Sequence, residues 1–240
     1  MISKVFPKIS TRGYYDLKTG KTIKNTSYDV YPKIAVHKIL QKSEIVIMIH
    51  GLRNNKSGAL AIYVIAKKRL KSLNYRHDVI GYSYDSNTAG VQYKSTALSA
   101  LKVGVLIAKK NGKNLSKFIL DAKLKNPSLK IRLMGHSLAN NSKNKGIIES
   151  VHFFGASIPA NSMKPDIHGN EFQKIVNKKI INHYSPYDDV LKAAHDENWV
   201  ESPIGYRGAL GTTCSKYIQK QVRPQNHRFV SYAKTIKSFP

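Results

Sequence analysis

Apolar runs and amphipathic segments alternate along this chain of 240 residues. The segment Ile45–Ile49 is apolar at every position, which is typical of a strand that is buried on both faces. Further strands are expected over residues 78–84, 131–134, 147–154 and 179–185. Helices are expected over residues 57–73 and 171–177, and over 93–125 as two helices broken near Asn111-Gly112. This alternation predicts an α/β fold, with a mostly parallel sheet flanked by helices.

The first forty residues have a different pattern, polar and without long apolar runs. Residues 13–23 read as a hairpin with a glycine-containing turn, which predicts an antiparallel edge before the parallel sheet. Nothing between this region and the C-terminus has the composition of a linker or a repeat. We therefore expect a single domain over 1–240, with an N-terminal hairpin region at 1–40 and a catalytic core at 41–240.

A short motif follows the strand at 131–134. Its sequence, Gly135-His136-Ser137-Leu138-Ala139, has the G-x-S-x-G pattern of a nucleophile elbow, with Ala in the last place. A serine at the tip of a tight strand-to-helix turn needs small residues two positions before it and two positions after it. Ser137 is therefore the candidate nucleophile.

The strand at 45–49 leads into His50-Gly51-Leu52-Arg53. In serine hydrolases, a loop after an early strand supplies one backbone N–H to the oxyanion hole. Gly51 allows the backbone to approach the reacting carbonyl. The N–H of Leu52 is the first choice for this donor, with Arg53 as the neighbour to consider. The N–H of Leu138 is the expected second donor, and each is worth about 3 kcal/mol in a developing oxyanion site.

Candidates for the acid and the base come later in the chain. Asp188 follows the strand expected at 179–185, and His227 lies near the C-terminus. Asp189 is the alternative acid. The order Ser137, Asp188, His227 is that of the α/β-hydrolases and differs from the chymotrypsin and subtilisin orders. In this arrangement His227 takes the serine proton, and the carboxylate holds the imidazole in the required tautomer.

With these motifs the chain resembles an α/β-hydrolase of the lipase/esterase type, over roughly residues 44 to 232. The resemblance rests on four features: the H-G-L loop, the G-H-S-L elbow, the strand ending in Y-S-P-x-D-x-V-L, and the final N-H-x-x-x-S-Y. In hydrolases with the D-x-V-L pattern the acid is the Asp two places before the Val, which corresponds to Asp188. The resemblance implies hydrolysis of carboxylic esters, including lipid esters, without a cofactor.

The net charge of the chain bears on which partners it could bind. The chain carries 40 basic and 14 acidic residues, for a net charge of +26. Arginine occurs at only eight positions (Arg12, Arg53, Arg69, Arg76, Arg132, Arg207, Arg223 and Arg228), so lysine dominates. Dedicated nucleic-acid sites favour arginine and interleaved aromatic residues. The charge therefore favours a general surface property, with weak electrostatic association with anionic membranes or nucleic acid.

Other sequence features exclude several alternatives. The single cysteine, Cys214, excludes an internal disulfide, and the N-terminus has no apolar stretch typical of a signal peptide, so a cytoplasmic location is expected. No apolar stretch reaches the ~18 residues that span a bilayer. No cluster of His, Cys or carboxylate residues has metal-ligand spacing, so no metal site is expected. The sequence leaves the oligomeric state open.

One segment departs from the hydrolase pattern. A buried helix normally follows the elbow, but residues 138–146 are mostly Asn, Ser and Lys before the next strand begins. A parallel crossover needs about a dozen residues, so only a loop or a single helical turn is expected here. Without the helix, the sheet face should be underpacked or covered by a substitute, and activity should be weakened.

Three functions therefore compete. The leading hypothesis is a serine esterase that forms an acyl-enzyme on Ser137. The second is a catalytically weakened α/β-hydrolase relative that acts as a binding module. The third is a basic protein that binds nucleic acid or an anionic membrane.

Overall fold

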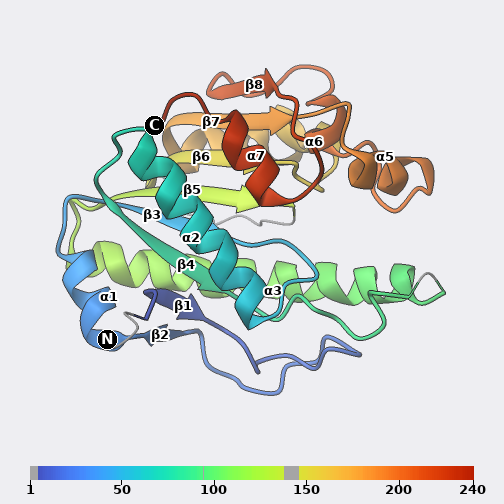
Figure 1. Ribbon diagram of the computed structural model, residues 1–240. Coiled ribbons are helices and arrows are strands. Elements are labelled where there is room, and N and C mark those ends of the chain that lie inside the picture. Colours follow the sequence, from blue (N-terminus) through green and yellow to red (C-terminus); the bar gives the residue numbers. More distant parts are fainter. Residues whose placement is uncertain (1–4, 94, 138–145) are drawn as a thin grey trace.

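Eight strands form one twisted sheet in the order β2-β1-β4-β3-β5-β6-β7-β8 (Figure 1). The computed structural model describes residues 5–93, 95–137 and 146–240. Every neighbouring pair of strands is parallel except β1 and β2, which run antiparallel at one edge. This is the expected α/β fold with a mostly parallel sheet and an antiparallel N-terminal edge.

The elements follow one another in the alternating order that the sequence predicts. The strands are β1 (Lys8–Ser10), β2 (Asp29–Tyr31), β3 (Glu44–Ile49), β4 (Asp78–Ser83), β5 (Lys130–His136), β6 (Ile148–Phe154), β7 (Val176–Tyr184) and β8 (Tyr217–Gln221). The helices are α1 (Lys33–Leu40), α2 (Lys56–Ser72), α3 (Ala97–Lys125), α4 (Asn170–Ile175), α5 (Asp189–Asp196), α6 (Ile204–Arg207) and α7 (Phe229–Thr235). A 3₁₀ turn (Ala160–Met163) and a π-helical turn (Pro165–Gly169) precede α4.

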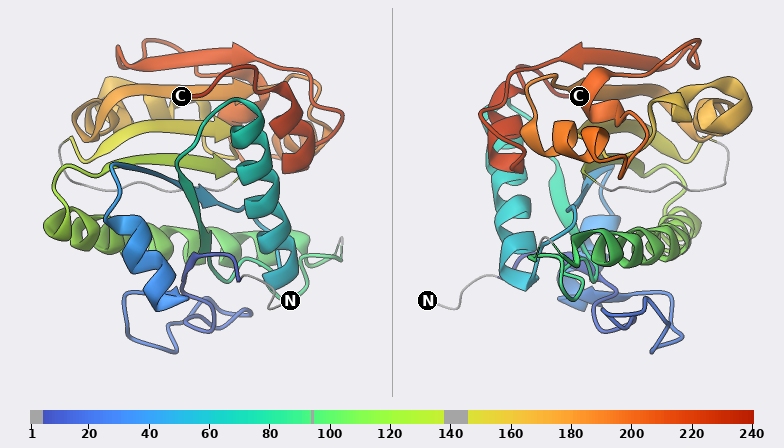
Figure 2. Two further views of the ribbon diagram at one scale, coloured as in Figure 1. Left: turned by 60° about the vertical axis from the view of Figure 1, so that its left-hand side comes forward. Right: turned by 90° about the vertical axis from the view of Figure 1, so that its right-hand side faces the viewer.

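Helices cover both faces of the sheet, which explains why residues 45–49 of β3 are all apolar. Its residues Ile45, Ile47 and Ile49 belong to a core cluster with α1, α3 and α4, whereas Val46 and Met48 belong to a second cluster with α2 and α7. Figure 2 shows α2 and α7 on one side of the sheet and α3 on the other. Both faces of β3 are buried, as its sequence predicts.

The expected break near Asn111-Gly112 is wrong, because α3 runs unbroken through both residues. The Asn111 side chain donates to the Ile107 carbonyl one turn earlier and accepts hydrogen bonds from the hydroxyls of Tyr82 and Thr11. Asparagine on its own favours turns over helices. Here buried partners on β4 and in the segment after β1 fix Asn111 within the helix. Tertiary contacts override the local preference at this position.

Three further boundaries differ from the sequence prediction. The region 13–23 contains one isolated antiparallel bridge, Tyr15 to Thr22, and the antiparallel edge itself is formed by β1 and β2 on either side of it. The helix expected over 171–177 ends at Ile175, because Val176 already pairs with Ile148 of β6. The strand expected over 179–185 begins earlier, at Val176, and ends at Tyr184.

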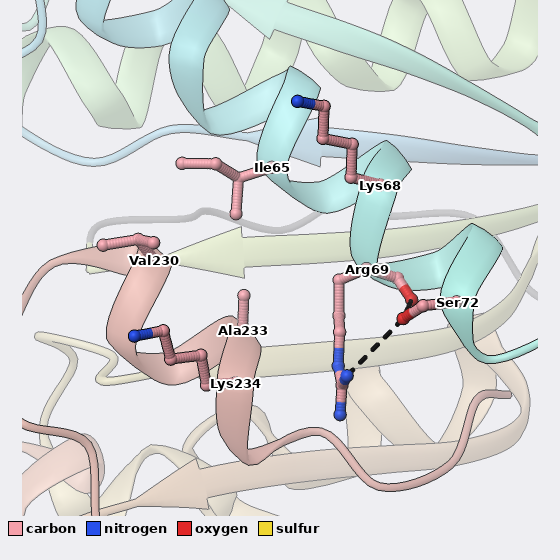
Figure 3. Close-up of a pocket in the computed structure, with 7 residues that line it drawn as sticks. All are labelled: Ile65, Lys68, Arg69, Ser72, Val230, Ala233 and Lys234. Atoms are coloured by element: carbon pink, nitrogen blue, oxygen red, sulfur yellow. Dashed lines mark hydrogen bonds between the residues drawn. The ribbon is translucent and has the colours of Figure 1, made fainter.

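A shallow groove of about 280 Å³ lies between α2 and α7 (Figure 3). Three apolar side chains and three cationic side chains line it, together with a serine: Ile65, Val230, Ala233, Lys68, Arg69, Lys234 and Ser72. None of the candidate catalytic residues is among them. No helix in the described part of the chain is both long enough and apolar enough to cross a bilayer.

Candidate active site

Ser137 occupies a left-handed backbone conformation immediately after β5, with φ of 62°. For a non-glycine residue this conformation costs about 1–2 kcal/mol and is found mainly where surrounding contacts enforce it. Here the Ser137 N–H donates to the Phe154 carbonyl at 3.2 Å, and the Ser137 carbonyl accepts from the Ser157 N–H at 2.9 Å. The end of β6 and the loop after it therefore hold the serine in the strained turn that a nucleophile elbow requires.

Asp188 and His227 form a hydrogen-bonded pair, although 39 residues separate them in the chain. The His227 Nδ1–H donates to Asp188 Oδ2 at 2.8 Å, and the carboxylate side chain is completely buried. Asp189, the alternative acid, is the first residue of α5 and is exposed. Asp188 is thus the carboxylate that contacts the imidazole.

The Asp188 carboxylate accepts two further hydrogen bonds. Oδ2 accepts from the Tyr232 hydroxyl at 2.6 Å, and Oδ1 accepts from the Leu191 N–H at 3.1 Å as the N-cap of α5. Burial by itself would raise the pKa of Asp188. The hydrogen bond and charge of His227, with the donors Tyr232 and Leu191, outweigh burial and lower the pKa, so the carboxylate stays ionised.

His136, the residue before the serine, contacts the candidate base directly. Its Nε2–H donates to the main-chain carbonyl of His227 at 2.7 Å, and the two rings lie 4.9 Å apart. Burial, followed by the charge of His227, lowers the pKa of His136 to about 3. A neutral imidazole therefore joins the elbow to the segment that carries His227.

The loop after β3 lies against the serine. A Cβ on Gly51 would lie 2.6 Å from Ser137 Cβ, so only glycine allows this approach. The Arg53 N–H donates to the Ser86 carbonyl at 2.8 Å, whereas the Leu52 N–H has no acceptor within the residues that the structure describes. Of the two amides considered for the oxyanion, that of Leu52 is the one left available. Leu138, the second expected donor, and the shortened segment 138–145 lie outside the described residues.

A buried polar network fixes this loop from the N-terminal region. The His50 Nδ1–H donates to the Gly51 carbonyl at 2.9 Å, and its Nε2 accepts from the Tyr84 N–H at 3.2 Å. The Arg12 guanidinium donates to the carbonyls of Asn54 and Asn55 at 3.0 and 3.1 Å. Burial, then the charge of Arg12, lowers the pKa of His50 to about 3. His50 and Arg12 thus set the path of residues 50–55, which we call the oxyanion loop after the role that the sequence predicts for it.

The Ser137 hydroxyl has a partner other than histidine. Its Oγ lies 3.3 Å from Ser157 Oγ, and no hydrogen bond joins it to His227 among the described residues. The structure therefore brings Asp188 and His227 into direct contact and brings His227 into contact with the neighbour of Ser137.

The described part of the chain contains no cluster of side chains that could bind a metal ion. No group of three or more His, Cys, Asp or Glu side chains there could hold an ion. Cys214 is buried, and burial raises the pKa of its thiol, which disfavours the thiolate needed for nucleophilic chemistry.

Two of the solved structures that are similar to this chain are esterase-type proteins by their names. An acetylxylan esterase matches at 10% identity with a TM-score of 0.38, over 80% of this chain and 91% of that one. A cutinase-like protein from Cryptococcus sp. matches at 11% identity with a TM-score of 0.33, over 75% of each chain. No family model and no curated protein matches the chain.

The sequence motifs did not reveal three contributors to the site: the Tyr232 hydroxyl on Asp188, the Ser157 hydroxyl on Ser137, and the Arg12 guanidinium on the oxyanion loop. Tyr232 had a detectable signal, since it ends the N-H-x-x-x-S-Y pattern. Arg12 and Ser157 had no such signal, because each lies far along the chain from its partner: Arg12 is 42 residues from Asn54, and Ser157 is 20 residues from Ser137.

Proposed function

We propose that this protein is a serine hydrolase that cleaves a carboxylic ester, lipid esters included, through an acyl-enzyme on Ser137. Two features carry the proposal together: a serine in a left-handed turn at the end of a parallel strand, and an Asp188–His227 pair whose carboxylate is buried. Parallel sheets present their sites where the strands end, which is where both features lie. Ring contact between His136 and His227 supports a common site for them.

In the proposed reaction, His227 acts through Nε2, because Nδ1–H is held by Asp188. As substrate binds, Ser137 Oγ exchanges its contact with Ser157 for His227 Nε2. The serine oxygen attacks the ester carbonyl and its proton passes to Nε2. The developing negative charge on the carbonyl oxygen is stabilised by the Leu52 N–H, and the sequence predicts the N–H of Leu138 as the second donor.

Collapse of this intermediate breaks the ester bond, and His227 returns the proton to the leaving alcohol. A water molecule then attacks the acyl-enzyme, with His227 again taking a proton. The carboxylic acid leaves and Ser137 regains its hydroxyl hydrogen. Asp188 stays ionised throughout and stabilises the imidazolium, in keeping with its lowered pKa.

The test is hydrolysis of p-nitrophenyl acetate, butyrate and octanoate by the wild-type chain and by Ser137→Ala, His227→Gln and Asp188→Asn. Each variant should lose activity by about 10³-fold or more. Asp189→Asn is the matched control, because it makes the same change one residue away on an exposed side chain, and it should keep wild-type rates. Wild-type hydrolysis that survives Ser137→Ala would refute the proposal.

The binding-module hypothesis predicts a different outcome of the same experiment. If the wild-type chain hydrolyses none of the three esters yet binds them, the fold has kept the elbow geometry without the reaction. Saturable binding that Ser137→Ala leaves unchanged would favour this second hypothesis over an esterase.

A further inference from the structure

Tyr232 shares an acceptor atom with the candidate base. Its hydroxyl donates to Asp188 Oδ2 at 2.6 Å, and the same oxygen accepts the His227 Nδ1–H at 2.8 Å. Tyr232 is completely buried in the middle of α7, five residues after His227. One short segment therefore supplies both donors to this oxygen.

The phenol ring is fixed by close packing on three sides. A Cβ on Gly155, at φ of 53°, would lie 2.9 Å from the Tyr232 hydroxyl oxygen, so the loop after β6 closes over it. The rings of His136 and His227 meet it edge-on, with centroids 6.0 and 6.5 Å away. Burial, and then the charge of Asp188, raises the pKa of Tyr232. The hydroxyl is thus a neutral donor whenever Asp188 is ionised.

We propose that Tyr232 is a positioning residue for the acid–base pair: its hydroxyl fixes Asp188 Oδ2 against His227 and moderates the charge that His227 meets. This inference rests on the proposed hydrolase function for its catalytic consequence. A carboxylate with one hydrogen-bond donor can rotate about its side-chain torsion. The Asp188 carboxylate has two donors on Oδ2 and one on Oδ1, so it cannot rotate without breaking a buried hydrogen bond.

The Tyr232 hydroxyl also reduces the negative charge that Asp188 presents to His227. A donated O–H withdraws negative charge from the carboxylate, so the imidazolium form of His227 is stabilised less than it would be by an unshared carboxylate. Tyr232 therefore weakens the attraction of Asp188 for the imidazolium form of His227, and removing its hydroxyl should strengthen that attraction. Among the described residues, the titratable side chains that face His227 are Asp188 from the start of α5, His136 from the end of β5 and Tyr232 from α7.

The test is Tyr232→Phe, which removes the hydroxyl and keeps the ring. NMR titration of the His227 imidazole should show its pKa rise by about 0.5–1 unit, since the carboxylate then acts on His227 alone. Tyr82→Phe is the matched control: Tyr82 is equally buried, and its hydroxyl bonds Asn111 far from His227. It should leave the pKa of His227 unchanged.

Kinetics give the second measurement. In Tyr232→Phe, kcat on a p-nitrophenyl ester should fall about tenfold with KM unchanged, because Tyr232 contacts Asp188 and not the substrate. The acid limb of the kcat/KM profile should move to higher pH with the His227 pKa. The inference would be overturned if folded Tyr232→Phe left the measured pKa of His227 unchanged. It would also be overturned if Tyr82→Phe shifted that pKa by the same amount as Tyr232→Phe.

The two proposals fail in different ways. If the wild-type chain hydrolyses no ester, the hydrolase proposal fails, while the NMR titration still tests whether Tyr232 acts on the Asp188–His227 pair. If the wild type is active and Tyr232→Phe has the same kcat and pH profile, the hydrolase proposal stands and the role of Tyr232 is refuted.

Discussion

Gly51 and Ser137 approach so closely that a methyl group on Gly51 would lie 2.6 Å from the Cβ of the serine and 2.9 Å from the His136 carbonyl oxygen. Neither contact involves the end of a flexible side chain, so the oxyanion loop or the elbow must move to relieve the overlap. Gly51→Ala should therefore displace the Leu52 N–H from the site. A displacement of about 1 Å costs about 100-fold in rate.

The measurement is kcat/KM for Gly51→Ala on a p-nitrophenyl ester, with circular dichroism to establish that the variant is folded. We expect the loss mainly in kcat, because an oxyanion donor acts in the transition state. A folded Gly51→Ala variant with wild-type kcat would show that the Leu52 N–H is not a donor to the reaction.

Arg12 connects the N-terminal region to the oxyanion loop. Its guanidinium reaches the carbonyls of Asn54 and Asn55 and the hydroxyl of Ser83, a fork that a lysine ammonium cannot reproduce. Arg12→Lys should lower kcat about tenfold and lower the melting temperature by several degrees, since the loop loses two hydrogen bonds.

Arg76→Lys is the control. It makes the same change at an exposed arginine whose side chain forms no hydrogen bond with the residues that the structure describes. A chain that begins at residue 41 should lose activity for the same reason as Arg12→Lys. Full activity of residues 41–240 alone would contradict this role and support a self-sufficient core.

Buried neutral histidines should make the fold sensitive to acid. Burial lowers the pKa of His50 and of His136 to about 3 and that of His183 to about 4, and it lowers the pKa of His152 as well. Below an unfolded-state pKa near 6.5, the unfolded chain binds protons that the folded chain does not, so stability falls as pH falls. Each such group contributes up to about 1.4 kcal/mol per pH unit, so the four together give up to about 5.5 kcal/mol per unit near pH 5.

Urea unfolding at pH 7, 6 and 5 measures this slope. His183→Gln should reduce it by about 1.4 kcal/mol per pH unit, because one proton fewer is taken up on unfolding. His37→Gln is the control, since His37 is exposed on α1 and should leave the slope unchanged. A stability that is flat between pH 7 and 5 would show that these histidines are not held neutral.

The net charge should produce weak association with anionic surfaces that reflects the whole chain. We expect binding to phosphatidylserine vesicles and to duplex DNA that falls steeply with salt and is indifferent to DNA sequence. Lys68 and Lys234 flank the α2–α7 groove (Figure 3), whereas Lys109 and Lys113 are exposed on α3. Reversing either pair to Glu changes the net charge equally and should weaken binding equally. Salt-resistant binding, or a loss confined to Lys68 and Lys234, would contradict a general charge effect.

Periodicity and motif spacing could predict the central fold because the signals there are local. Residues 45–49 of β3 are all apolar, and the candidate elbow, acid and base each lie directly after a strand or near the chain end. The edge strands β1 and β2 have three residues each, too few for a pattern to be recognised. The exposed strand β8 and the seven-residue helix α7 are equally weak signals. Their positions are set by what they pack against.

The same distinction holds within the site. Motifs single out Ser137, Asp188 and His227, and the D-x-V-L pattern already favours Asp188 over Asp189. In the structure Asp188 lies 2.8 Å from the His227 imidazole. The roles of Tyr232 and Arg12 depend on hydrogen bonds across 44 and 42 residues of chain. No local pattern encodes such pairs, because the whole sheet must form before they meet.

The central claim, that Ser137 is an activated nucleophile, is tested most directly by reaction with a fluorophosphonate followed by intact-mass analysis and peptide mapping. Its phosphorus bonds to an activated serine oxygen as fluoride leaves, whatever the natural ester is. The account predicts one adduct per chain, on Ser137, formed slowly because of the short segment after the elbow, absent in Ser137→Ala and retained in Asp189→Asn. A wild-type chain that stays unlabelled, or an adduct that persists in Ser137→Ala, would contradict it.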